Sequence, residues 1–299
     1  MALNKEIWVN TLIEGFWPDD SFVVRSVDHS VFSDGKTVHV PNGGSAPTVT
    51  KNPSQFPASV TQRTDTDLTY DLDRYVTAPV LVQQMEDVEL SYDKRTSILA
   101  QSRKALRLAV MEDLLKKWAS DAGATVQTSG AGEAAHVNTT ATGSRKALVK
   151  GDILNVKKQM DLGDVPAEGR SMLLDAVMYN QLLNSLTDAE TAHFLAGADI
   201  VHGVVGKYMG FEFMMRSTAL QTTPTGQLKT GAAAATDCAA GLAWHRDSVS
   251  RALGEVLAFE SEKDPTYYGD IVSFAMRAGG RGIRADKKGI VLLTQATAS

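Results

Sequence analysis

The sequence predicts an α+β fold in which one long helix and an extended strand ribbon join a section of short helices and strands. The helix is expected over 96–120, where apolar residues recur at helical spacing. The ribbon is expected over 60–73, where apolar and acidic residues alternate with a period of two. From residue 150 onward, short apolar runs typical of buried strands lie between amphipathic segments.

Composition places the chain among ordinary globular proteins. Its 299 residues are 43% hydrophobic and 22% charged, which argues against wholesale disorder and allows one large domain or two. The net charge of −5 argues against a dedicated nucleic-acid binder. The single cysteine, Cys238, excludes an internal disulfide and a cysteine-based zinc site. No secretory signal and no apolar run long enough for a membrane helix are present, so a cytosolic chain with no membrane contact is expected.

The N-terminal part predicts a short helix followed by a hairpin. Residues 5–16 are amphipathic, and Pro18 is expected to end this helix. Asp34-Gly35 lies between apolar residues in 31–40, which predicts a hairpin with a two-residue turn.

A proline-rich loop leads from this hairpin to the ribbon. Residues 41–57 contain four of the nine prolines, so a loop is expected there. The ribbon strand over 60–73 could span about 45 Å. A ribbon of this length has too little local core to be stable alone. We therefore expect it to lie on another protein.

The remaining elements follow from local patterns. The helix over 96–120 carries a wide apolar stripe, as expected for a helix covered by two layers, and Gly123 is expected to close it. A loop or flap is expected over 123–144, and another low-charge stretch over 217–241. Helices are expected over 150–160, over 176–186 with Asp175 as the cap, and over 246–253. Strands are expected over 171–174, 211–215, 242–244, 255–259, 271–276 and 290–294.

Catalytic, cofactor and metal signatures are missing from the sequence. The six histidines are dispersed, and none forms a His-x-x-x-His pair. The run from His245 to Ser248 contains the residue types of a nucleophilic triad, but such triads assemble from distant positions, so helix capping is the preferred interpretation. Gly206-Lys207 lacks the serine or threonine of a phosphate loop. We therefore predict no catalytic residue, no cofactor and no metal.

Two charged clusters are candidates for contacts between subunits. Four aspartates share one face of the ribbon strand, namely Asp65, Asp67, Asp71 and Asp73. They could bind calcium, meet a basic partner or simply face solvent. Five basic residues and one acid give a net charge of +4 near the C-terminus, through Arg277, Arg281, Arg284, Lys287 and Lys288. This basic turn could bind phosphate, form a charged contact or face solvent. We hypothesise that the aspartates of one subunit pair with the basic turn of another, and that this contact weakens at high salt.

The order of the elements resembles the major capsid proteins of tailed bacteriophages, which have the Hong Kong 97-like fold. Residues 75–79 leading into 88–93 carry the likeness, and the helix over 100–118 that follows resembles the spine helix of this family. Residues 175–183, 210–213 and 243–247 resemble segments of its axial domain. Residues 269–272 and 290–292 resemble its returning peripheral-domain strands. The likeness covers nearly the whole chain.

The resemblance implies a division into four parts. These are an N-terminal arm (1–32), an extended loop with a proline-rich tip (33–85), a peripheral domain with the spine helix (86–149 and 251–299) and an axial domain (150–250). It also implies a virion structural protein that forms hexamers and pentamers in an icosahedral shell around double-stranded DNA. Assembly is expected in the host cytoplasm.

The resemblance further implies certain partners. They are other copies of the chain, a portal, packaged double-stranded DNA in non-specific contact and a decoration protein, together with either a separate scaffolding protein or none. An encapsulin-like protein compartment is the alternative with the same fold. A cytosolic α+β enzyme with an unrecognised site is the alternative from another class.

Overall fold

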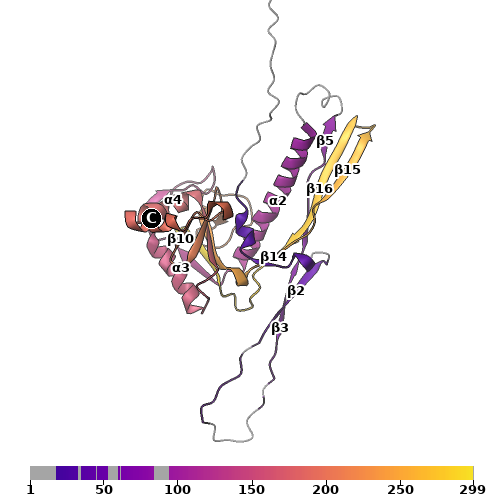
Figure 1. The fold of residues 1–299 in the computed structure, drawn as a ribbon. Coiled ribbons are helices and arrows are strands. Elements are labelled where there is room, and N and C mark those ends of the chain that lie inside the picture. The colour runs from indigo at the N-terminus through magenta and orange to yellow at the C-terminus, as the bar shows by residue number, and fades with distance from the viewer. Residues whose placement is uncertain are drawn as a thin grey trace, which may run out of the picture.

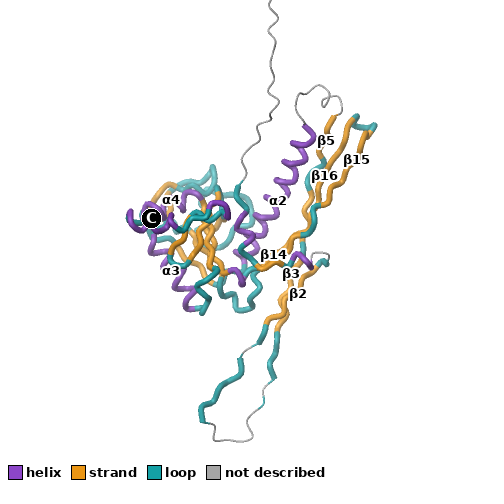
Figure 2. Tube along the Cα trace, in the orientation of Figure 1, coloured by secondary structure: helices purple, strands orange, loops and turns teal. Residues whose placement is uncertain are grey.

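The computed structural model describes residues 18–32, 35–44, 46–52, 60, 62–83 and 94–298. It has three parts, which are a rounded lobe, an elongated wing and a two-stranded ribbon that extends away from both (Figure 1). Helices and strands occur together in the lobe and in the wing, whereas strands form the base of the ribbon (Figure 2). The helix expected over 5–16 lies outside the described residues.

A seven-stranded sheet forms the centre of the lobe. Six of its strands lie in the order β10-β11-β9-β13-β17-β6, and β12 pairs with β13. The pairs β9–β11 and β17–β6 are parallel, and the other pairs are antiparallel. The strands are β6 (Ala124–Gln127), β9 (Arg170–Asp175), β10 (Gly206–Tyr208), β11 (Phe211–Arg216), β12 (Leu220–Thr222), β13 (Cys238–His245) and β17 (Ile290–Thr294).

Helices cover both faces of this sheet. One face packs against α3 (Lys150–Leu162), α4 (Ala176–Ser185) and α5 (Asp188–Ala196), and the other packs against the long helix α2 (Lys94–Ser120). Met172 of β9 points to the first face and Leu173 to the second, as the two-residue period of a strand requires. Burial on both faces explains why these strands are continuous apolar runs. Asp175 caps α4 as predicted, because its Oδ1 accepts from the Met178 amide at 2.6 Å.

The wing consists of α2 and a six-stranded sheet with β16 at its centre. Antiparallel β4, β5, β14 and β15 all pair with β16, and β1 adds in parallel to β14. Helix α2 runs beside β5 and β16 (Figure 1), and Val272, Phe274 and Met276 of β16 share a core with it. The strands are β1 (Val27–Asp28), β4 (Asp73–Val76), β5 (Val80–Gln83), β14 (Ser250–Leu253), β15 (Leu257–Asp264) and β16 (Gly269–Gly279).

Aromatic side chains join the wing to the lobe. Trp118, near the end of α2, is fully buried 5.7 Å from Trp244 of β13, measured between ring centroids. Phe22 packs edge-on against both indoles from the short 3-10 turn η1 (Ser21–Val24). The core around these rings contains residues of both sheets, so wing and lobe share one apolar core at the base of α2.

The ribbon is formed by β2 (Thr37–Asn42) and β3 (Thr66–Asp71), which pair antiparallel. The hairpin expected over 31–40 is wrong, because the 3-10 turn η2 (Ser30–Phe32) precedes β2 and β2 pairs with β3 instead. Local turn chemistry could not reveal this partner, which lies beyond the proline-rich segment. The predicted alternation is confirmed within β3, where Tyr70 is buried and its neighbours Thr69 and Asp71 are exposed. The strand is shorter than the expected 60–73, because the described residues 60 and 62–65 form no strand and Asp73 begins β4.

Three further expectations need correction. The helix expected over 246–253 is the 3-10 turn η4 (Arg246–Ser248) followed by strand β14, whose small residues fit between β1 and β16. The flap expected over 123–144 contains β6 and the hairpin of β7 (Gly132–Ala134) with β8 (Ser144–Lys146). Gly123 follows α2 but is required for a different reason, since an added Cβ would lie 2.3 Å from the Lys287 carbonyl oxygen.

The two sheets divide the chain differently from the expected domains. Strands β6 and β17, expected with the peripheral part, hydrogen-bond within the seven-stranded sheet of the lobe. Element order alone could not show these memberships, because they depend on pairing between distant segments.

Gly280 supplies a test of the packing beside α2. A Cβ there would lie 2.3 Å from the Ser250 carbonyl oxygen and 2.5 Å from Leu114 Cδ1. We expect Gly280→Ala to lower the free energy of unfolding by about 1–3 kcal/mol through overpacking. Gly231→Ala is the control, because nothing lies within 4 Å of its added Cβ. Urea unfolding of the unassembled chain measures both, and equal midpoints for the two variants would contradict the expectation.

Candidate assembly surfaces

No described residue in the outer part of the ribbon, over 43–65, is buried. The last strand pair is Asn42 with Thr66, and the intervening 43–65 segment could reach about 35–40 Å beyond it. In this segment, Val49 is 91% exposed and Val60 is 98% exposed. Isolated two-stranded ribbons are marginally stable in water, so this part is suited to order against another surface.

The base of the ribbon is held firmly by the rest of the chain. Val38 and Tyr70 form a small buried core with Ala252 of β14. The Asn42 side chain donates to the Ile283 carbonyl oxygen at 3.0 Å and accepts from the Ala285 amide at 3.3 Å. These contacts fix where the ribbon leaves the body of the protein.

Two of the four predicted aspartates form ion pairs within the chain. Asp65 accepts from Arg63 Nε at 2.5 Å, and this bond lowers the pKa of its carboxyl group. Asp73 lies in β4 and pairs with Lys117 of α2. These two carboxylates are therefore largely neutralised by partners in their own chain.

The other two aspartates keep their charge available. Asp67 Oδ2 lies 2.5 Å from His39 Nδ1 across the ribbon, and both side chains are exposed. Asp71 accepts from the Thr37 hydroxyl at 2.6 Å, which does not compensate its charge. Asp67 and Asp71 lie on the same exposed face of β3. The expected acidic face is thus reduced to Asp67, whose partner is a histidine, and Asp71, whose partner is a hydroxyl group.

The basic turn is also partly paired internally. Arg281 forms an ion pair with Asp121 at 3.2 Å and donates to the Thr69 carbonyl oxygen at 3.0 Å, which ties the turn to the ribbon of the same chain. Arg284 is paired with Asp286 at 2.7 Å, a contact that raises the pKa of Arg284. Lys287 and Lys288 are exposed. Pairing of this turn with another subunit stays a prediction.

Arg277 lies in a setting that sequence reasoning missed. It stands directly opposite Arg74 in the β16–β4 pair, and both residues are exposed. Like charges opposite each other destabilise a strand pair, and no ion pair joins either arginine to a described residue. They line a groove of about 340 Å³ together with Leu257 and Phe259. No local signal could find this pair, because its register joins two distant segments.

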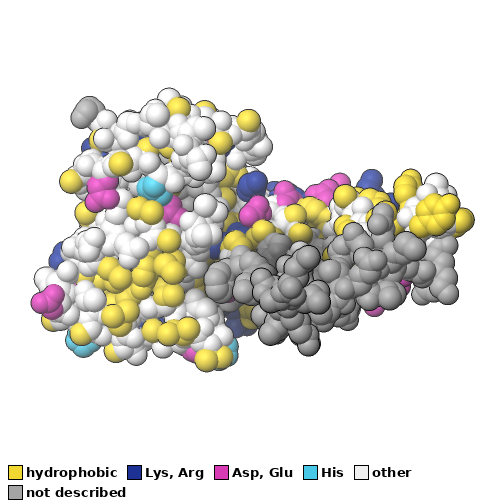
Figure 3. Space-filling view, turned by 90° about the horizontal axis from the view of Figure 1, so that it is seen from above, with side chains coloured by type: hydrophobic (Ala, Val, Ile, Leu, Met, Phe, Trp, Pro, Cys, Tyr) yellow, Lys and Arg dark blue, Asp and Glu magenta, His cyan; other side chains and the backbone are white. Residues whose placement is uncertain are grey.

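The lobe and the wing present different surfaces. Seen from above, the lobe shows a broad area of hydrophobic side chains, whereas charged side chains of both signs are interspersed along the wing (Figure 3). Adjacent Ile200 and Val201 of the 3-10 turn η3 (Ile200–His202) are both strongly exposed. Exposed apolar side chains next to mixed charges are typical of surfaces that contact other proteins.

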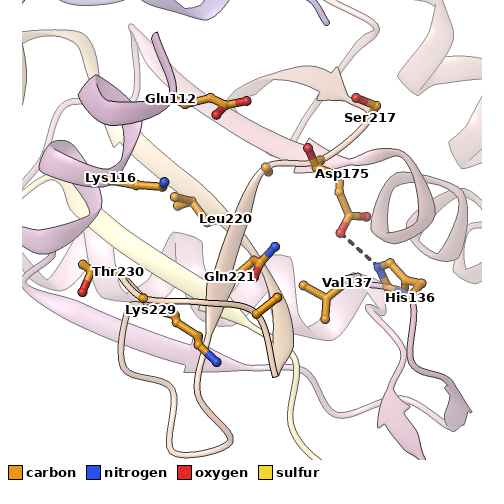
Figure 4. Close-up of a pocket in the computed structure, with 14 residues that line it drawn as sticks. Glu112, Lys116, His136, Val137, Asp175, Ser217, Leu220, Gln221, Lys229 and Thr230 are labelled. Atoms are coloured by element: carbon orange, nitrogen blue, oxygen red, sulfur yellow. Dashed lines mark hydrogen bonds and ion pairs between the residues drawn. The ribbon is translucent and has the colours of Figure 1, made fainter. Parts of the chain in front are cut away.

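A cavity of about 260 Å³ between α2 and the lobe is the candidate for an active site. Glu112 and Lys116 reach it from α2, and Ser217 lines it from the lobe (Figure 4). His136 Nε2 lies 3.0 Å from Asp175 Oδ2 beside it. The other ring nitrogen, Nδ1, is buried with no hydrogen-bond partner among the described residues. Among the described residues that line this cavity, no hydroxyl group is hydrogen-bonded to a base. Nucleophilic catalysis needs such a pair.

The other catalytic candidates have structural roles. His245 accepts from the Asp247 amide at 3.2 Å and its Nε2 lies 2.8 Å from the Glu168 carbonyl oxygen, so both ring nitrogens are engaged with backbone groups. Gly206-Lys207 begins strand β10 rather than a phosphate loop. Where residues are described, no group of three His, Cys, Asp or Glu side chains could hold a metal ion. No helix in the described ranges is both long and apolar enough to cross a bilayer.

A long helix on an open sheet, a compact lobe and a projecting ribbon define a structural protein with the Hong Kong 97-like fold. The profile of the phage capsid protein family matches residues 26–296. The chain belongs to this family, and it is a capsid structural protein that forms the icosahedral shell. No curated protein sequence matches the chain.

Solved structures of low sequence identity share the fold. A chain of Mycobacterium phage Che8 aligns with a TM-score of 0.68 and 19% identity over 98% of each chain. The capsid of the cyanophage P-SCSP1u aligns with a TM-score of 0.66 and 18% identity, over 99% of this chain and 94% of that one. The capsid of a native GTA particle aligns with a TM-score of 0.64 and 13% identity, over 99% of this chain and 96% of that one.

His29 makes the base of the ribbon sensitive to pH. Its ring stacks on Tyr70, with Nδ1 3.1 Å from the phenol oxygen, and burial lowers the pKa of His29. An unfolded histidine titrates near pH 6.5. A histidine whose pKa is lowered on folding destabilises the folded chain as pH falls below that value, because the unfolded state binds the proton more readily.

We therefore expect the free energy of unfolding to be higher at pH 7.5 than at pH 5.5, and His29→Gln to reduce this difference. Asp28, next in the chain, also has a lowered pKa, but as a carboxyl group it loses its stabilisation only at more acidic pH. Urea unfolding of the unassembled chain at the two pH values provides the measurement. An unchanged difference in the variant would show that His29 is not its source.

Proposed function

We propose that this chain is a major capsid protein whose copies form both hexamers and pentamers around double-stranded DNA. The observation that carries the proposal is the ribbon, whose firmly held base supports an outer segment with almost fully exposed valines. Exposed apolar side chains on a projecting segment are typical of a surface that a neighbouring subunit covers. The work of the protein is then geometric, with no catalytic residue and no cofactor.

The partners follow from the same role. Copies of the chain are the principal partners, with a separate scaffolding protein and a portal during assembly in the host cytoplasm. The exposed Lys287 and Lys288 suit non-specific contact with packaged DNA phosphates. A decoration protein is a further partner of the finished shell.

Purified protein tests the proposal directly. A capsid protein gives megadalton particles that sediment together and show icosahedral outlines in electron micrographs. Nuclease-protected double-stranded DNA in particles from infected cells distinguishes a virion shell from an encapsulin-like compartment, which would hold an enzyme instead. Particles that turn over a substrate through the cavity near His136 would overturn the non-enzymatic role.

Deleting the outer ribbon tests whether it covers a neighbour. Replacing residues 46–60 by a two-glycine turn keeps Asn42 and its bonds to the basic turn. We expect folded subunits with an unchanged unfolding midpoint, because every described residue of the removed segment is exposed. Assembly should fall at least tenfold, as measured by sedimentation. Normal shells from the deleted chain would refute the role of the ribbon.

We propose a charged contact between subunits that involves fewer residues than the two clusters seen in the sequence. Asp67 and Asp71 of one subunit face Arg277 and Arg74 of another, since Asp65, Asp73, Arg281 and Arg284 have partners within the chain. A carboxylate between two opposed arginines relieves their repulsion. Each exposed contact contributes only about 0–1 kcal/mol, but a shell repeats it at every subunit.

Charge reversal tests this contact. We expect R74E/R277E to slow assembly in 0.05 M salt, and D67K/D71K in the same chain to restore it. The matched control is R284E, which changes a charge outside the groove. The difference between variant and wild type should shrink in 1 M salt, where screening acts within about 3 Å. Equal assembly of R74E/R277E and R284E would exclude the groove as the contact.

A further inference from the structure

Asn42 ties the ribbon to the rest of the chain. It is the last residue of β2, and its Nδ2 donates to the Ile283 carbonyl oxygen at 3.0 Å and to the Val40 carbonyl oxygen at 3.2 Å. Its Oδ1 accepts from the Ala285 amide at 3.3 Å. One carboxamide group therefore uses both its donor and its acceptor to hold the ribbon against the basic turn.

The residue that follows Asn42 makes this carboxamide chemically reactive. Asn42-Gly43 is the one Asn-Gly sequence in the chain. The backbone nitrogen after an asparagine can attack the side-chain carbonyl carbon, because the product is an unstrained five-membered ring. A side chain on the following residue hinders this attack, and glycine has none. Asn42 is thus the asparagine whose neighbouring nitrogen is least hindered.

The Gly43 amide is left unpaired by the fold. The β2–β3 ladder ends at the pair of Asn42 with Thr66, and the Gly43 nitrogen donates to no described residue. The next amide, that of Gly44, is held by Asp65 Oδ1 at 2.8 Å. Gly43 is exposed, so water and hydroxide reach its nitrogen. Within a helix or a paired strand this nitrogen would be engaged in a hydrogen bond.

The carbonyl group under attack is polarised by the fold. The Ala285 amide that donates to Asn42 Oδ1 withdraws electron density from Cγ and stabilises the oxyanion that forms on attack. Asn180 of α4 is the contrast. It is more exposed than Asn42, but its Nδ2 donates to the Ala176 carbonyl oxygen at 2.8 Å and the next residue, Gln181, lies within the helix.

We propose that Asn42 deamidates spontaneously and that the product loosens the base of the ribbon. The Gly43 nitrogen loses its proton to hydroxide and bonds to Cγ of Asn42, and the Cγ–Nδ2 bond breaks as Nδ2 leaves as ammonia. Water then opens the resulting succinimide ring. Cleavage at one carbonyl gives aspartate, and cleavage at the other gives isoaspartate, in which the main chain runs through the side-chain carbon. The net reaction consumes one water and releases one ammonia.

The product cannot make the bonds of the original side chain. A carboxylate at position 42 is ionised at neutral pH and has no donor, so the bonds to the Ile283 and Val40 carbonyl oxygens are lost. Its second oxygen then lies against these two carbonyl oxygens, which repel it. Isoaspartate also adds a carbon to the main chain before Gly43. The core around Val38 is untouched, so the ribbon loosens without leaving the body of the protein.

Mass spectrometry of the folded chain, aged in mildly alkaline buffer, measures the reaction. We expect a gain of about 1 Da in the peptide that contains Asn42, partly as isoaspartate, and no gain in the peptide that contains Asn180. We expect G43A to slow the gain about tenfold or more, because its methyl group hinders the attacking nitrogen. An aged, folded chain with unmodified Asn42, or an equal rate in G43A, would overturn the site.

The G43A variant is expected to keep the fold. Gly43 does not have a positive φ, so alanine fits its backbone. The atoms nearest to the added Cβ belong to the guanidinium group of Arg63, with Nη2 at 2.7 Å. This group ends a flexible side chain that is 59% exposed, and it can move aside.

Hydrogen exchange measures the loosening. N42D reproduces the aspartate product in every chain, and we expect it to accelerate exchange of a peptide covering β3 about tenfold, because two hydrogen bonds are lost. N180D makes the same chemical change on α4 and should leave this peptide unchanged. If N42D fails to fold, the deamidated fraction of aged wild-type chain, separated by ion exchange, gives the same readout. Exchange equal to that of the fresh wild-type chain would overturn the loosening.

The effect on assembly rests on the proposed function, in which the ribbon covers a neighbouring subunit. We expect aged chains and N42D to assemble more slowly than fresh wild-type chains in sedimentation, and N180D to assemble normally. N42D that assembles at the wild-type rate would overturn this effect. A wild-type chain that forms no particles would refute the proposed function, whereas the mass gain and the exchange of β3 still decide whether Asn42 reacts and loosens the ribbon.

Discussion

The burial of Trp118 at the base of α2 is the constraint on which the arrangement of wing and lobe depends. Its indole donates to the Ser250 carbonyl oxygen at 2.8 Å in the wing and packs against Trp244 in the lobe. Each sheet has an apolar face that would be exposed to water without α2. Helix α2 packs against both of these faces. Trp118 therefore lies where the cores of the two sheets meet, in contact with Phe22 and Trp244.

Much of the fold could be predicted from local patterns. The wide apolar stripe indicated α2, the uninterrupted apolar runs indicated β11 and β17, and Asp175 indicated the start of α4. The helix expected over 246–253 is instead the 3-10 turn η4 followed by strand β14. What decides its structure is nonlocal, namely the space that the fully buried Ser250 and Ala252 fill between neighbouring strands.

The candidate contact surfaces show the same limit more clearly. The acidic and basic clusters were visible in the sequence, but their free charges were not, because Lys117 in the last turn of α2 and Asp121 just after this helix are distant in sequence from Asp73 and Arg281. The opposed pair of Arg74 and Arg277 exists only through strand register. Sequence periodicity shows which face of an element a residue takes, whereas the availability of its charge depends on which distant element lies beside it.

The positions of β16 and β17 have a consequence for how the protein is made. Each is an internal strand of its sheet, although both follow the strands that they join in the sequence. A nascent chain that has not reached residue 294 therefore lacks the strands that connect the earlier ones into sheets. Neither the lobe nor the wing is complete until residues 269–294 have been made.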